Sequence, residues 1–349
     1  MLTRRAFLRQ TAFATAVTCF PAAFAAADAI ASFFVVGDTH YRAAEENFRR
    51  LDPVSAHYNR RLIDWLNKLP GTAFSRELGG LTVPKPHGVV HAGDIVDSGD
   101  EIGAKLKKAD TEMAAFTTEW GLNGTEGRLR WPVREVHGNH DAPRGETVVT
   151  DAIKSRNQRR AGLINLSPNG LHYSWDWAGV HFVALGIVVG GAPEITRRRH
   201  YAPLGSLTFL QEDLAAHVGK SGRPVVVVHH VDAPRYSETL PDDRIINREW
   251  DYGDVHAYYS LLREYRVAAA ICGHTHTRNV FRWDGTNNPR SAQGVPFLNT
   301  DNAALFYNAT QAFLHVSITR AHLFVREFAT NDGWITGAWT PQVWKFDLA

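Results

Sequence analysis

Five short apolar runs, each followed at once by polar residues that can bind a metal, dictate the architecture of this 349-residue chain. The runs are rich in β-branched residues and lie at 33–36, 88–90, 133–136, 225–228 and 267–271. Runs of this length and composition are typical of buried strands. Longer segments with helical spacing separate them, at 47–69, 102–120, 207–218 and 255–265. This alternation predicts an α/β fold in which sheets are covered by helices.

Two further pairs of short runs have the pattern of β-hairpins. One pair lies at 171–177 and 180–185, around Ala178-Gly179, and the other at 315–318 and 323–328, around Ala321-His322. Short strands are expected to dominate from about Val280 onward. Because no linker interrupts the chain, we predict a single domain over residues 28–349.

Metal-competent residues occur directly after each of the five apolar runs. They are Gly37-Asp38-Thr39-His40, Gly93-Asp94-Ile95-Val96-Asp97, Gly138-Asn139-His140-Asp141, His229-His230 and Gly273-His274-Thr275-His276. Strand ends in an α/β sheet meet at one edge, where ligands bind. A glycine beside the metal-competent residues lets the backbone turn sharply, so that these side chains can point into a shared cavity.

The donor types in these segments indicate which ions could be held. Carboxylates, one amide and several imidazoles suit divalent ions such as Mn²⁺, Fe²⁺ or Zn²⁺. Two such ions about 3.5–4 Å apart and bridged by one aspartate are the layout expected for phosphoester hydrolysis. The sequence therefore predicts a site for two divalent metal ions.

The order of the five segments, D-x-H, G-D-x-x-D, G-N-H-D, H and G-H-x-H, resembles the signature of calcineurin-like metallophosphoesterases. It extends from Asp38 to His276. Each segment alone is a weak signal, but five in this order, each at a strand end, are specific. The resemblance implies an α/β fold that is a four-layer αββα sandwich, with two mixed β-sheets flanked by helices.

The resemblance also implies a role for each residue. The first metal would be held by Asp38, His40 and His276, the second by Asn139, His229 and His274, and Asp94 would bridge the two. His140 would protonate the leaving group and Asp97 would orient His140. A hydroxide bridging the metals would attack phosphorus in line.

The fourth segment offers two histidines, and only one can be the ligand because adjacent strand residues face opposite sides. We expect His229 to be the ligand, since the first histidine of such a pair coordinates in similar proteins. His230 would then lie near substrate or exposed to solvent.

Several residues near these segments have weaker functional signals. Tyr41, Arg42 and Arg144 are next to predicted ligands and could contact a phosphate. The basic run Arg197-Arg198-Arg199 could attract a polyanion or simply be a solvated loop. Three aromatic residues after the fourth segment could line the pocket or pack beneath a loop: Tyr236, Trp250 and Tyr252.

The expected substrate is a small phosphomonoester or phosphodiester. The formal net charge is +2, and three of the arginines lie in the N-terminal leader, so the remaining chain is close to neutral. No nucleic-acid partner is expected, since binding would need a clear excess of basic residues. The alternatives are a non-catalytic metal-carrying binding protein of the same fold, and a nuclease.

Residues 1–27 resemble a twin-arginine signal peptide. Arg4 and Arg5 are followed by Phe7-Leu8, a mildly apolar run and small residues near Ala25 and Ala27. The apolar run is too short to cross a bilayer, so no stable membrane anchor is expected. We predict export by the twin-arginine machinery to the periplasm or outside the cell.

Overall fold

The computed structural model describes residues 30–195, 199–235, 249–287 and 291–348. The predicted signal peptide, Arg197, Arg198 and Tyr236 lie outside these residues. No helix in the described part of the chain is both long enough and apolar enough to cross a membrane.

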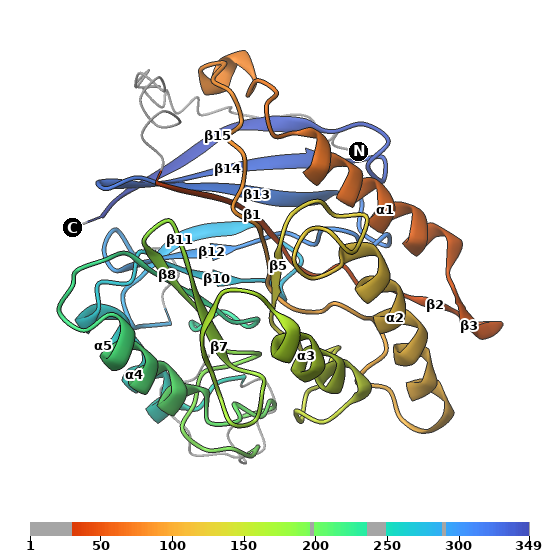
Figure 1. Cartoon of the computed structure of the whole chain (residues 1–349), viewed down its shortest axis with the longest axis horizontal. Helices are drawn as coiled ribbons and strands as arrows, with labels where there is room; N and C mark the ends of the chain where they lie inside the picture. The colour runs from red at the N-terminus through yellow and green to blue at the C-terminus, as the bar shows by residue number, and fades with distance from the viewer. Residues whose placement is uncertain (1–29, 196–198, 236–248, 288–290, 349) are drawn as a thin grey trace, which may run out of the picture.

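Two mixed β-sheets form the centre of the molecule (Figure 1). The first has six strands in the order β15-β14-β13-β1-β4-β5. Its strands are β1 (Ala31–Val36), β4 (Val89–His91), β5 (Val133–Glu135), β13 (Gln311–Ile318), β14 (His322–Thr330) and β15 (Ala338–Asp347). β1, β4 and β5 are parallel, whereas β13, β14 and β15 continue the sheet with antiparallel pairings.

The second sheet has seven strands in the order β11-β12-β10-β9-β8-β7-β6. Its strands are β6 (Leu163–Leu166), β7 (Tyr173–Trp177), β8 (Val180–Ala184), β9 (Val225–Val228), β10 (Ala269–Cys272), β11 (Asn279–Trp283) and β12 (Val295–Asn299). β8, β9, β10 and β12 are parallel. A separate short ribbon pairs β2 (Ala43–Ala44) with β3 (Asn47–Leu51).

Helices cover the outer face of each sheet. The helices are α1 (Pro53–Lys68), α2 (Lys108–Trp120), α3 (Val148–Arg159), α4 (Ser206–His217) and α5 (Tyr252–Glu264), with short 3₁₀ turns at Arg76–Leu78 and Gly103–Lys107. Helices α1 to α3 lie on the six-stranded sheet, and α4 and α5 on the seven-stranded one (Figure 1). The order is thus helices, sheet, sheet, helices, which confirms the four-layer αββα sandwich.

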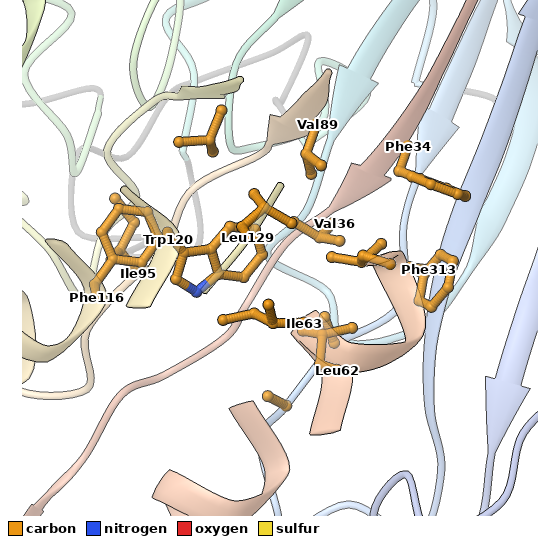
Figure 2. Close-up of a cluster of buried hydrophobic side chains, with 14 of the residues drawn as sticks. Phe34, Val36, Leu62, Ile63, Val89, Ile95, Phe116, Trp120, Leu129 and Phe313 are labelled. Carbon is orange, nitrogen blue, oxygen red and sulfur yellow. The ribbon is translucent and has the colours of Figure 1, made fainter. Parts of the chain in front are cut away.

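Three buried clusters hold the four layers together. Figure 2 shows part of the first, which brings together Leu62 and Ile63 of α1, Phe116 of α2, and Phe34 and Val36 of β1. A second cluster lies under α4 and α5. The third fills the space between the sheets and includes Val226 and Val228 of β9. Alternate residues of β9 therefore face the other sheet, while Val225 and Val227 face the helices.

Most expected elements are confirmed, including all five strands and both hairpins. The helix expected from residue 47 begins only at Pro53, because Asn47–Leu51 form β3. Asp52 caps this helix by accepting from the backbone N–H groups of Val54 and Ser55, and proline is favoured at the first helical position. Helix α3 has no counterpart among the expected helices.

Candidate metal centre

The candidate site lies where parallel strands of both sheets end. β1, β4 and β5 of the first sheet and β9 and β10 of the second lead directly into the five metal-competent segments. Backbone hydrogen bonds join these segments. The Asp38 N–H donates to Gly93 O over 2.9 Å, and the Gly273 N–H donates to His230 O over 2.9 Å. Residues far apart in the sequence therefore meet at one edge.

Four side chains form the first group of possible metal ligands: Asp38, His40, Asp94 and His276. One ligand atom from each lies within 4.8 Å of all the others. His40 Nε2 is 3.1 Å from His276 Nε2 and 3.8 Å from Asp94 Oδ2. His276 Nε2 is 3.3 Å from Asp38 Oδ1. These residues are the ones expected around the first metal.

The second group consists of Asp94, His230 and His274, with the Asn139 amide among them. His230 Nε2 lies 3.1 Å from both Asp94 Oδ2 and Asn139 Oδ1. His274 Nδ1 lies 2.7 Å from Asn139 Oδ1. Asp94 belongs to both groups, which is the position required of a bridging ligand.

The choice of His229 as the cluster histidine was wrong, because the structure places His230 there. The side chain of His229 faces the helices, where its Nε2 is 2.8 Å from the Tyr258 hydroxyl and its Nδ1 is 2.8 Å from Val231 O. Its ring also packs against Trp250. Alternation along β9 explains this placement, since His230 continues the side of Val226 and Val228 that faces the other sheet.

A carboxylate or carbonyl oxygen lies close to the second ring nitrogen of three cluster histidines, and it forms a hydrogen bond to that of His230 and of His274. His40 Nδ1 is 3.2 Å from Asp97 Oδ1, and His230 Nδ1 is 2.7 Å from Ala92 O. His274 Nε2 is 2.8 Å from Glu249 Oε1. Each acceptor leaves the other nitrogen free to bind a metal. Glu249 is not among the predicted site residues, because it lies in a loop outside the five metal-competent segments.

His140 lies at the exposed side of the cluster, and its side chain is 38% exposed. Its backbone N–H donates to Asp94 Oδ1 over 2.8 Å, and its ring lies 5.0 Å from that of His40. The nearest carboxylate to its Nδ1 is that of Asp100, at 3.4 Å. The expected pairing of His140 with Asp97 is therefore corrected: Asp97 contacts His40, and Asp100 takes the place beside His140.

The backbone of the cluster is strained. Asp38, His40, Asp94, His274 and His276 all have positive φ, between 39° and 74°. Such angles are uncommon for residues other than glycine, and they concentrate at functional sites. Neighbouring glycines allow the close approach. A Cβ on Gly138 would lie 2.2 Å from Asp94 Oδ1, and one on Gly273 would lie 2.5 Å from Asp38 Oδ2.

Charge in the cluster favours bound cations. Burial alone would raise the pKa of Asp94, but His230 and His40 hold it well below its usual value. Burial alone would lower the pKa of His230, yet Asp94 raises it to about 9. The pKa of His276 is raised by Asp38 against the effect of burial. Without ions, protons thus supply the positive charge that the carboxylates attract. The donor set and this charge both fit divalent metal ions.

The surroundings of His140 favour the protonated form of its imidazole when no ion is bound. Burial alone would lower its pKa, but the nearby Asp100 carboxylate and the charges of Asp94 and Asp97 raise the pKa of His140 to about 10 when no ion is bound. Its imidazole is therefore protonated at neutral pH in that state. A protonated, partly exposed imidazole beside a candidate metal site can donate a proton to a departing oxygen.

The other residues singled out in the sequence have varied surroundings. Tyr41 is buried, and its hydroxyl donates to Glu119 over 2.9 Å. Trp250 is buried beside His229, so it packs beneath its loop. Arg199 pairs with Asp254. Arg42 lies at the edge of the cluster, with its Nε 3.7 Å from Asp97 Oδ2.

Comparison with known proteins agrees with this architecture. The profile of the calcineurin-like phosphoesterase family matches residues 31–278. Among solved structures, a dimetal phosphatase from Danio rerio is similar at 16% identity and a TM-score of 0.53, over 92% of this chain and 100% of that chain. No curated protein sequence matches significantly.

Two other solved structures align less closely. GAP50, the anchor in the inner membrane complex of Plasmodium, is 13% identical with a TM-score of 0.44, over 88% of each chain. A predicted phosphoesterase from Streptococcus pneumoniae is 10% identical with a TM-score of 0.33, over 91% of this chain and 97% of that chain.

The fold and the cluster define an α/β sandwich protein with a candidate two-metal site at its shared sheet edge. Because the family profile covers most of the chain, the chain belongs to the calcineurin-like phosphoesterase family.

Proposed function

We propose that this protein hydrolyses phosphomonoesters or phosphodiesters with two divalent metal ions, such as Mn²⁺, Fe²⁺ or Zn²⁺. The observation that carries the proposal is the position of Asp94, which belongs to both groups of possible ligands. Asp38, His40 and His276 would hold one ion, and Asn139, His230 and His274 the other. Two ions so placed supply Lewis acidity and lower the pKa of water.

The protein's own residues would do the rest of the chemistry. Glu249 and the Ala92 carbonyl hydrogen-bond His274 and His230, and Asp97 lies beside His40, so these contacts would orient the imidazoles before substrate arrives. His140 would donate its proton to the leaving oxygen. Asp100 would hold the His140 ring in place during this transfer.

A panel of phosphoesters with and without metal tests this function. Chelation should abolish cleavage of p-nitrophenyl phosphate or bis(p-nitrophenyl) phosphate, and Mn²⁺ should restore it, because the ligand atoms act on substrate only through the ions. Plasmid DNA in the same panel tests the nuclease alternative. Full activity in chelator-treated, metal-free protein would contradict the two-metal proposal.

A non-catalytic, metal-carrying protein of the same fold is the second candidate. It would bind the ions but turn over neither ester. The presence of His140 beside the cluster supports the enzyme, since a binding protein has no need of a proton donor there. Metal bound at two equivalents with no turnover of any ester would favour the binding protein.

We also propose export through the twin-arginine route, which rests on Arg4, Arg5 and the short apolar run after them. The mature protein would begin within a few residues of Asp28. Arg4→Lys with Arg5→Lys should leave the longer precursor in the cytoplasm. Precursor that is still exported and trimmed after this double change would rule the route out.

A further inference from the structure

An exposed aromatic ring lies beside the candidate metal centre. Tyr307 is 63% exposed, which makes it the most exposed large aromatic side chain in the described part of the chain. Its ring lies over the guanidinium of Arg42, with 5.0 Å between Arg42 Cζ and the ring centroid. Neither the metal ligands nor the proton donor explains why a large ring is held in solvent at this position.

Side-chain contacts connect this ring to the cluster. Arg42 Nε is 3.7 Å from Asp97 Oδ2, and Asp97 Oδ1 is 3.2 Å from His40 Nδ1. The His140 ring lies 5.0 Å from that of His40, which Asp97 contacts, so the Tyr307 ring lies on the side of the cluster that carries the proposed proton donor. A leaving group protonated by His140 would depart toward this side.

The loop that carries Tyr307 is anchored to the first metal-competent segment. The Ala303 N–H donates to Gly37 O over 2.9 Å, and Ala303 O accepts from the Trp334 indole over 2.7 Å. Phe306 packs beside Tyr307 with 4.4 Å between ring centroids. Contacts with Arg42 and Phe306 therefore hold the ring in place, while most of its side chain stays exposed.

The charges around Arg42 indicate what the ring would bind. Asp97 and Glu45 both lie close to the guanidinium, with Glu45 Oε1 3.0 Å from it. Because two carboxylates oppose its charge, Arg42 is a poor clamp for a second phosphate. It is better placed to support the Tyr307 ring, whose exposed surface can stack on a planar group.

Resting on the proposed function, we propose that Tyr307, supported by Arg42, is a leaving-group subsite for a planar ring carried some bonds away from the phosphorus, as in a nucleoside phosphate. Two side chains, Asp97 and Arg42, separate the ring from His40. A ring attached directly to phosphorus would therefore reach it less well than one attached through a ribose. Tyr307 would select substrates by stacking and take no part in the chemical step.

Binding of non-hydrolysable phosphonates to the metal-loaded protein tests the subsite without turnover. The probes are methylphosphonate, phenylphosphonate and a phosphonate analogue of adenosine 5′-monophosphate, measured by calorimetry. Tyr307→Ala should lower the affinity for the adenosine analogue about three- to tenfold, the usual effect of losing one aromatic stack. The affinity for methylphosphonate should stay within about twofold of the wild-type value. Tyr307→Phe keeps the ring and should bind all three probes as the wild type does.

Ile164→Ala is the matched control, since Ile164 is exposed on β6 at the far edge of the seven-stranded sheet. It should change no affinity. If Tyr307→Ala lowered the affinity for methylphosphonate and for the adenosine analogue equally, or lowered neither, the subsite would be overturned. If Tyr307→Ala lowered the affinity for phenylphosphonate as much as that for the adenosine analogue, the subsite would not prefer a ring separated from the phosphorus by a ribose. Failure of the proposed function gives a different result, namely phosphonate binding without cleavage of any ester.

Discussion

Asp94 connects the two halves of the site at the scale of single residues. Its Oδ2 faces His230 and His40, and its Oδ1 accepts the backbone N–H of His140. One carboxylate thus touches both groups of possible ligands and also positions the segment that carries the proton donor. Gly138 leaves the space for it, because any side chain there would collide with Asp94.

The two adjacent histidines after β9 should respond to substitution in different ways. His230→Ala removes a side chain of the second group and should lower the bound metal per chain. His229→Ala should leave the metal content unchanged but lower the free energy of unfolding by about 1–3 kcal/mol, because the Tyr258 hydroxyl loses a buried partner. Metal analysis and urea unfolding of both variants check this. Loss of metal in His229→Ala alone would restore the first histidine as the ligand.

Glu249 should affect metal affinity without touching a metal. Its carboxylate fixes His274 Nε2, so that Nδ1 faces Asn139. Glu249→Ala should weaken metal binding about 10–100-fold, the usual effect of losing such a partner. Glu249→Gln keeps an acceptor oxygen and should therefore lose less metal affinity than Glu249→Ala. A calorimetric metal titration in which Glu249→Ala binds as tightly as the wild type would show that the contact has no such role.

Strand β5 and helix α3 are held together by a buried ion-pair network at the scale of elements. Glu135 Oε1 is 2.6 Å from Arg156 Nε and 2.5 Å from Arg160 Nη2. All three side chains are buried. The network lies on the strand that leads to Asn139 and His140, so it supports one wall of the site.

Loss of Glu135 should destabilise the protein strongly. Glu135→Gln leaves two buried guanidinium groups without their carboxylate and should lower the free energy of unfolding by about 3–5 kcal/mol. Burial alone would raise the pKa of Glu135, but Arg156 and Arg160 lower it to about 2. The stabilisation is therefore fully present above about pH 4.5 and is lost as the pH falls toward 2. Urea unfolding of the wild type and the variant measures both effects, and equal stability at pH 7 would contradict them.

The strands could be predicted from the sequence because each is a compact run of β-branched residues. The start of α1 and the presence of β3 were missed, since the apolar residues before Asp52 also fit a helical spacing. The choice between His229 and His230 could not be made from the sequence. β9 consists of four valines, which give no sign of which face meets the other sheet. Asp100 and Glu249 reach the cluster only through the fold of their loops.

Buried histidines away from the cluster should make the whole molecule sensitive to acid. Burial lowers the pKa of His172 to about 4 and that of His315 to about 3. The unfolded chain takes up a proton at each below about pH 6.5, whereas the folded protein does not. Each should therefore reduce the free energy of unfolding by up to about 1.4 kcal/mol per pH unit as the pH falls from 6.5 toward 4.

His315→Gln isolates one of these contributions. The variant removes the titrating ring and should make the fall in stability between pH 6.5 and pH 5 less steep than in the wild type. Urea unfolding at several pH values gives both slopes. An unchanged slope would mean that His315 does not contribute to the acid sensitivity.

The molecule as a whole is two sheets whose parallel strands end at a common edge, and we propose that this edge holds two ions. The most direct measurement is metal content together with kcat for the wild type, Asp94→Asn and His140→Asn. The wild type should hold two divalent ions per chain. Asp94→Asn should lose metal and activity together, whereas His140→Asn should keep both ions while kcat falls about 10²–10⁴-fold. One ion in the wild type, or metal loss in His140→Asn with retention in Asp94→Asn, would contradict the account.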